Sequence, residues 1–183
     1  MSNFDYYVHL QSPTMNPAGL TAEARALANR TWCCPGCNRP KPGIERLDAH
    51  LQNRRLQWPL NIVNGYDLPL ARWSFLLRLG EERVRRSLYL GDVFGPDGSR
   101  WDDWVTFRGK HGLIVRGSTE HAGNRVCPEC GRNCYFGMYP KYLYPQPPTD
   151  VEIFESYECG LILRPDIATE VGIGDKVGRI QGV

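Results

Sequence analysis

The 183-residue sequence lacks the segments that would place a protein in a membrane or direct it out of the cell. No apolar run approaches the roughly 18 residues that a membrane-spanning helix needs. The first residues, Met1–Asp5, contain neither the basic stretch nor the apolar stretch of a secretion signal. We therefore expect a cytoplasmic protein that does not bind membranes.

The sequence also lacks a strong excess of charge and the common catalytic motifs. Its 22 basic and 20 acidic residues leave a formal net charge of +2, which gives little general attraction to nucleic-acid phosphates. It contains no phosphate-binding glycine loop, no G-x-S-x-G elbow and no dinucleotide fingerprint. The sequence therefore predicts no enzymatic activity and disfavours nucleic acid as a partner.

What the sequence does contain is seven cysteines, four of which form two matching C-P-x-C motifs, Cys34–Cys37 and Cys127–Cys130. Two thiolates three positions apart can bind one metal ion from a single turn. Proline favours that turn, and the next residue, Asn38 or Gly131, tolerates a positive φ. Four thiolates suit a closed tetrahedral Zn²⁺ site. We predict one structural zinc bound by Cys34, Cys37, Cys127 and Cys130.

The two motifs lie far apart, because 89 residues separate Cys37 from Cys127. Closing that loop costs about 4 kcal/mol of chain entropy, whereas a structural zinc site contributes on the order of 10–16 kcal/mol. The zinc is therefore predicted to hold two distant segments together, here named the first knuckle (33–38) and the second knuckle (127–134).

Several alternatives to this zinc site remain open. The two motifs can be unrelated reduced or redox-active pairs, and an iron site with four thiolates has the same sequence pattern. Cys33 and Cys134 are second-choice ligands because they neighbour the two motifs. Cys159 lies in an apolar strand pattern and is interpreted as a core thiol.

The hydrophobic patterns predict a single α+β domain over residues 1–183, with an antiparallel sheet and two or three helices connected by a split, zinc-ribbon-like site of four cysteines. Residues 44–126 are interpreted as an inserted helix and β-meander between the knuckles. The meander should contain strands over 87–94, 104–107 and 113–116. Helices are expected at Ala22–Asn29, at Pro69–Ser87 with an interruption at Gly80, and at Asp166–Val171.

Two groups of residues are candidates for binding a partner. The first is a set of arginines on the helix expected over 69–87, although such a set is usually just a solvated helix face: Arg78, Arg83, Arg85 and Arg86. The second is expected at an exposed hairpin tip, although its tryptophans can instead pack inward: Trp101, Asp102, Asp103 and Trp104. Tryptophan and arginine are enriched among residues that dominate binding energy.

The order of the motifs resembles one known family. The first C-P-x-C follows a short strand and helix, and Cys127–Arg132 (CPECGR) follows a long middle region. A stretch rich in aromatic residues and proline comes next, and Asp150–Phe154 and Leu161–Ala168 lie near the end. This layout is similar to that of the double-CXXCG-motif proteins, bacterial immunity proteins that neutralise polymorphic toxins. Asn38 stands where the family motif has glycine.

The resemblance implies a small cytoplasmic protein with no catalytic residues, which binds the active domain of a cognate protein toxin and blocks it. The alternative is a zinc-ribbon protein that binds nucleic acid or acts as a regulator, because zinc ribbons commonly serve in that way. A basic face would favour the alternative, since phosphate binding requires concentrated positive charge.

Overall fold

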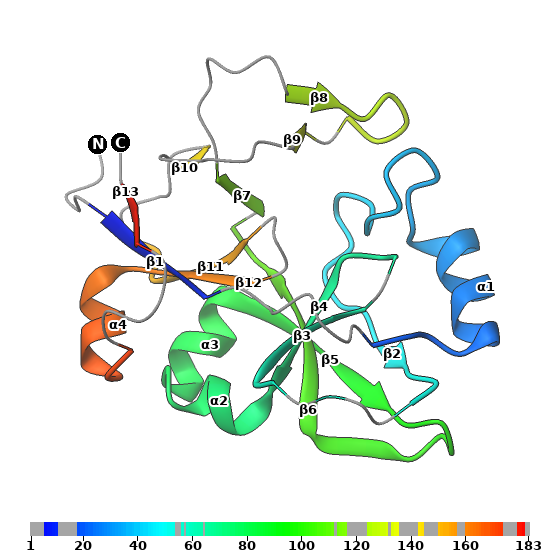
Figure 1. Cartoon of the computed structure of the whole chain (residues 1–183), viewed down its shortest axis with the longest axis horizontal. Helices are drawn as coiled ribbons and strands as arrows, with labels where there is room; N and C mark the ends of the chain where they lie inside the picture. Colours follow the sequence, from blue (N-terminus) through cyan, green and yellow to red (C-terminus); the bar gives the residue numbers. More distant parts are fainter. Residues whose placement is uncertain are drawn as a thin grey trace.

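A computed structural model describes residues 6–10, 18–53, 56, 58–63, 65–111, 113–116, 124–131, 133–135, 143–144, 150–156, 160–173 and 179–181. These residues form two large β-sheets, one small hairpin and four helices. Figure 1 shows the five-stranded sheet near the centre, with α1 (Ala22–Thr31) on one side of it and α2 (Trp73–Leu77) and α3 (Glu81–Ser87) on the other. The fold is therefore α+β, as the sequence predicts.

The five-stranded sheet is antiparallel except where its short edge strand pairs in parallel with β5. Its centre is the β5–β6 hairpin, which turns at 95–99 with Gly98 at a φ of 76°. The strands, in spatial order, are β2 (Ala49–His50), β5 (Leu88–Phe94), β6 (Arg100–Gly109), β4 (Leu68–Arg72) and β3 (Leu60–Val63).

The second sheet has six strands, and it combines segments from both ends of the described chain. In spatial order they are β10 (Leu143–Tyr144), β7 (Leu113–Arg116), β11 (Ile153–Ser156), β12 (Gly160–Leu163), β1 (Tyr6–Leu10) and β13 (Arg179–Gln181). β7 pairs in parallel with β11, and the other pairs are antiparallel. A separate hairpin consists of β8 (Asn124–Val126) and β9 (Asn133–Tyr135).

The helices begin where the sequence provides suitable first residues. The hydroxyl of Thr21 accepts a hydrogen bond from the Ala24 backbone N–H at 3.2 Å and caps α1. Pro165 occupies the first turn of α4 (Pro165–Glu170), where its missing N–H has no helical partner to lose. In the part of the chain that the structure describes, no helix is long and apolar enough to cross a membrane.

The five-stranded sheet is buried on both faces, which explains the nearly continuous apolar run of β4. Leu68 and Leu70 belong to one core together with Ala28 of α1. Ala71 belongs to a second core, formed with α2, α3 and the six-stranded sheet. Members of this second core from the other elements are Val8, Leu76, Val84, Leu161, Leu163 and Ala168. Each face of the central sheet therefore contributes to a different core.

Two expectations for the middle of the chain are wrong. The sequence pattern predicts that Pro69–Arg72 begins a helix, but it belongs to β4, where burial on both faces gives an apolar pattern that also fits a helix. The interruption at Gly80 is confirmed, because the helix after β4 is divided there into α2 and α3 and Gly80 has a φ of 90°. The strand at 113–116 does not extend the meander, because β7 crosses to the six-stranded sheet.

A buried ion pair connects the two large sheets where the chain passes between them. The Arg108 guanidinium of β6 donates from Nε to both carboxylate oxygens of Glu155 of β11, each at 3.2 Å. Glu155 also accepts the Gly109 N–H at 2.7 Å. The two charged side chains are 10% and 5% exposed, so neither can recover hydration if the other is removed.

We expect Glu155→Gln to lower the free energy of unfolding by about 3–5 kcal/mol, because it leaves the Arg108 charge buried without a carboxylate. The measurement is urea unfolding followed by tryptophan fluorescence. The matched control is Glu170→Gln, which removes a carboxylate whose side chain is 59% exposed and 3.0 Å from Arg83. The control should change stability by less than about 1 kcal/mol. Equal effects of the two substitutions would contradict this role of Glu155.

Candidate metal centre

The first knuckle is the tip of a narrow two-stranded loop that follows α1. Cys33 and Pro40 form an antiparallel bridge, and the Lys41 N–H donates to the carbonyl of Trp32 at 2.7 Å. Inside it, the Cys34 N–H donates to the Arg39 carbonyl at 2.8 Å. Trp32 and Cys33 belong to the same core as α1, so the knuckle is fixed to the body of the protein.

The second knuckle is also the tip of a hairpin. β8 and β9 flank it, with Val126 paired to Asn133. Both knuckles close with the same backbone hydrogen bond from the residue after the second cysteine. The Asn38 N–H donates to the Cys34 carbonyl at 2.8 Å, and the Gly131 N–H donates to the Cys127 carbonyl at 2.9 Å.

The residue that ends each turn has a left-handed backbone, as the sequence predicts. The φ angles are 54° at Asn38 and 68° at Gly131. Glycine adopts this conformation without a Cβ clash, and asparagine is among the side chains that tolerate it best. Asn38 therefore allows the same turn as the glycine of the second knuckle.

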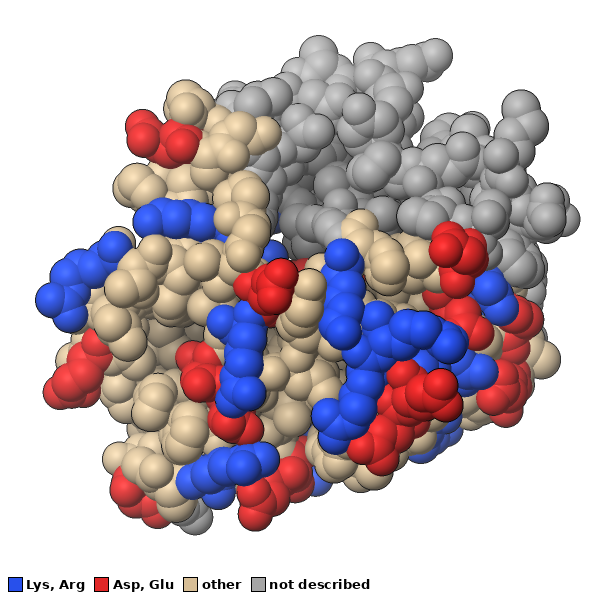
Figure 2. All heavy atoms as spheres, turned by 180° about the vertical axis from the view of Figure 1, so that it is seen from behind, with Lys and Arg blue, Asp and Glu red and all other residues tan. Residues whose placement is uncertain are grey.

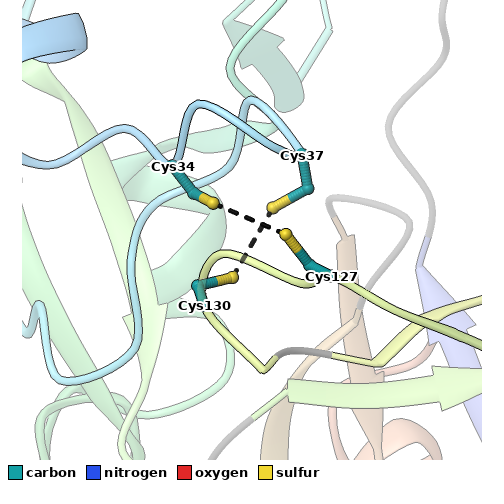
Figure 3. A group of neighbouring side chains, drawn as sticks. All are labelled: Cys34, Cys37, Cys127 and Cys130. Atoms are coloured by element: carbon teal, nitrogen blue, oxygen red, sulfur yellow. Dashed lines mark hydrogen bonds between the residues drawn. The ribbon is translucent and has the colours of Figure 1, made fainter.

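The four predicted ligands meet in one cluster, in which all four Sγ atoms lie within 4.8 Å of one another. The Sγ atoms of Cys34 and Cys127 are 3.6 Å apart, and those of Cys37 and Cys130 are 3.8 Å apart (Figure 3). A regular tetrahedron with metal–sulfur bonds of about 2.3 Å has edges of about 3.8 Å. The sulfur positions therefore fit one metal ion held by two thiolates from each knuckle.

Close packing between the knuckles explains the glycine within the first motif. A Cβ at Gly36 would lie 2.9 Å from the Cys127 sulfur and 2.8 Å from Cγ of Glu129. Both contacts are with the second knuckle, so a side chain at position 36 would push the ligands apart. The sequence analysis assigns Gly36 no role and misses this contact, for which the glycine in C-P-G-C is the available signal.

The protein environment favours one thiolate in the metal-free cluster. Burial raises the pKa of the Cys34 thiol, but hydrogen bonds from the Gly36 backbone and from Cys130 outweigh burial and lower this pKa to about 7. Burial raises the pKa of the Cys37 thiol, and hydrogen bonds with Cys34 and Cys130 raise it further. A metal ion must displace the remaining protons, so the affinity for metal falls as the pH is lowered.

The other cysteines do not join this cluster within the described residues. Cys33 is 3% exposed, and its Sγ lies 3.7 Å from the Cys34 carbonyl oxygen, so it is a core thiol behind the first knuckle. The side chain of Cys134, which is in β9, and the whole of Cys159 lie outside the described residues. The four thiols of the C-P-x-C motifs are therefore the ones brought together.

The arginines expected to bind a partner lie on a different part of the molecule, and two of them contact a single carboxylate. Arg83 Nε and Arg86 Nη2 lie 3.3 Å and 2.6 Å from Oε2 of Glu152. Arg164 Nη2 approaches the other carboxylate oxygen of Glu152 at 3.7 Å. Glu152 is mostly buried beneath them, so these guanidinium groups connect α3 to the segment that precedes β11.

The other two arginines also contact the chain itself. Arg85 Nε donates to Glu81 at 2.8 Å, and its guanidinium lies 5.3 Å from the ring centroid of Trp73. Arg78 donates to the Val171 carbonyl at 3.3 Å. On the face shown in Figure 2, basic and acidic side chains alternate. The basic face that would favour nucleic-acid binding does not appear on the described surface in this view.

The segment Trp101–Trp104 lies within β6 and not at a hairpin tip, which corrects the sequence expectation. Trp104 is 4% exposed and packs in the core with α1, while the half-buried Trp101 packs against the same core. Asp102 and Asp103 remain exposed. The acidic half of this candidate site is therefore accessible, whereas one of its tryptophans is largely internal.

A scan of protein-family models, a search of curated proteins and a search of solved structures found no match to this chain.

We expect the purified protein to contain about one zinc ion per chain. Cys34→Ser and Cys130→Ser should each lose the metal and lower the melting temperature, because three thiolates leave the tetrahedral shell open. Cys33→Ser is the control and should retain the metal, because its sulfur lies outside the cluster. The measurements are elemental analysis and thermal unfolding. A metal-free wild-type protein that unfolds at the same temperature as the metal-loaded form would contradict a stabilising metal.

We also expect Gly36→Ala to weaken zinc binding by about 10- to 100-fold. The new methyl group would clash with the Cys127 sulfur and displace it. Gly131→Asn is the matched control, since space around its Cβ is open and Asn38 already adopts the same backbone conformation. Competition with a chromophoric chelator measures both affinities. If Gly36→Ala binds zinc as tightly as Gly131→Asn does, the contact between the knuckles does not constrain the site.

Proposed function

We propose that this protein is a non-enzymatic immunity protein that uses a structural zinc ion to maintain its shape and that binds and blocks a cognate bacterial toxin. The observation that carries the proposal is the meeting of two C-P-x-C knuckles, separated by 89 residues, in one four-thiolate cluster. The same two motifs carry the resemblance to the double-CXXCG-motif proteins.

Zinc is the metal that suits the ligand set best. Four thiolates in tetrahedral positions are typical of structural zinc, and they leave no coordination position for water or substrate. Two of the sulfurs are almost fully buried, at 1% exposure for Cys34 and 4% for Cys127. Such a site supports a role in holding the knuckles together, which agrees with a protein that acts by binding.

A rigid scaffold favours tight binding to a toxin, because less conformational entropy is lost on association. The metal centre would fix the second knuckle against the first, and the Arg108–Glu155 pair connects the two large sheets. The exposed surface carries charges of both signs (Figure 2), which suits recognition of one protein partner through a specific charge pattern.

The product of the gene adjacent to the one that encodes this chain is the natural candidate toxin. We expect the two purified proteins to form a stable complex in a pull-down, and co-expression to restore growth of cells that produce the toxin in the cytoplasm. Cys33→Ser should protect as the wild type does, whereas Cys34→Ser should protect poorly because the scaffold loses its metal. If a toxic neighbour neither binds this chain nor is neutralised by it, the proposed function is wrong.

A further inference from the structure

The exposed acidic residues of β6 border a small pocket. Its volume is about 320 Å³, and it lies between the segment before β3, the end of β4 and the first half of β6. The described residues that line it are Leu56, Arg72, Trp101, Asp103 and Trp104. Asp102, the immediate neighbour, does not line it. We name this feature the Trp101 pocket.

The pocket lies beside an irregularity in the pairing of β5 and β6. Asp92 of β5 pairs with Val105, and Phe94 pairs with Arg100. An advance of two residues along β5 therefore lies opposite an advance of five residues along β6. The additional residues bulge out of the ladder, and this allows Trp101 and Trp104 to pack toward the same core. Bulges commonly redirect side chains beside functional sites. The aromatic wall of the pocket is a consequence of this irregularity.

The cationic groups at this end of the sheet already have close partners. Arg72 places its guanidinium 5.3 Å from the ring centroid of Trp104. Arg100 lies 3.2 Å from Asp92 and 3.4 Å from Asp102. By contrast, Asp103 is 65% exposed, and its ion pair with Arg72 is long, at 3.9 Å. Among the described residues that line the pocket, Asp103 therefore carries the most available charged group.

The size of the pocket limits what it can hold. Sites for complete small molecules range from about 300 to 1,000 Å³ and enclose most of the ligand. The Trp101 pocket is at the lower end of that range and has an exposed rim, so it matches one long side chain of a larger partner. Leu56 and Trp104, both almost fully buried, offer an apolar floor for an alkyl chain.

We propose that the Trp101 pocket binds a lysine or arginine side chain of a protein partner. The alkyl stem lies on Leu56 and Trp104, and the cation faces Asp103 and the Trp101 ring. Tryptophan is the aromatic side chain that attracts cations most strongly, and long basic side chains bury their stems while their charged ends stay near water. The identity of the partner as a toxin rests on the proposed function, but the preference of the pocket for a cation does not.

Substitution of Arg72 tests whether the ligand is positively or negatively charged. Its guanidinium covers Trp104 at the wall of the pocket, and it repels an incoming cation from a short distance. Arg72→Met keeps an unbranched side chain over Trp104 and removes this repulsion. A cationic ligand should therefore bind Arg72→Met at least as tightly as the wild type, whereas an anionic ligand should lose its main attraction.

The experiment is a titration of the full-length, zinc-loaded protein, followed by the indole N–H signals of ¹⁵N-labelled tryptophan. The probes are the N-acetyl methylamides of arginine, norleucine and glutamate, together with guanosine monophosphate. Trp101→Phe assigns the signal. We expect the arginine probe alone to shift the Trp101 signal saturably, with a dissociation constant on the order of 1–10 mM.

Asp103→Asn should weaken binding of the arginine probe by about three- to tenfold, and Asp102→Asn should leave it nearly unchanged. Both substitutions remove one exposed carboxylate from β6, so they are matched in charge and position. An effect of the glutamate probe that disappears in Arg72→Met would overturn the proposal in favour of an acidic ligand. A response to guanosine monophosphate alone would indicate a nucleotide site, and no response to any probe would also overturn the proposal.

This outcome is separable from that of the proposed function. If the arginine probe binds and the neighbouring toxin does not, the toxin assignment fails and the pocket remains a cation site. If the toxin binds equally well to wild type and to Asp103→Asn, and the arginine probe does not bind, the assignment of the pocket fails while the immunity function stands.

Discussion

The contact between two hairpin tips is the constraint on which the structure depends most. The first knuckle is attached to the core shared by α1 and the five-stranded sheet. The second knuckle follows β7 and precedes β10 along the chain, and both of these strands belong to the six-stranded sheet. A metal ion at their meeting point would therefore restrain both sheets. The Arg108–Glu155 pair links the same two sheets, in addition to the apolar core that they share.

Many of the described charged side chains form ion pairs with other residues of the same chain. Glu152 forms ion pairs with three guanidinium groups, and Asp92 forms ion pairs with Arg46 and Arg100. Such internal pairing orders long side chains in advance of binding, so less rotamer entropy would be lost at an interface. It also explains why a concentration of arginines in the sequence need not mark a docking surface.

The sequence predicts the meeting of the four cysteines and the fold class well, because both depend on local patterns. Spacing within C-P-x-C determines the knuckle, and the turn needs only a residue such as Asn38 that tolerates a positive φ. The path of β7 and the position of β4 are predicted incorrectly, because strand partners and two-sided burial depend on segments far away in the chain. The Trp101 pocket is missed for the same reason, since a bulge is visible only once the register of β5 and β6 is known.

The position of β1 in the six-stranded sheet has a consequence for synthesis of the chain. Of the strands that the structure describes, β1 is synthesised before all the others, yet both of its partners, β12 (Gly160–Leu163) and β13 (Arg179–Gln181), are synthesised after all the rest. Until they emerge, both hydrogen-bonding edges of β1 lack their native partners, and exposed strand edges invite pairing with other chains. The nascent protein is therefore vulnerable to aggregation in the interval between synthesis of β1 and synthesis of β12 and β13, when the six-stranded sheet cannot yet form.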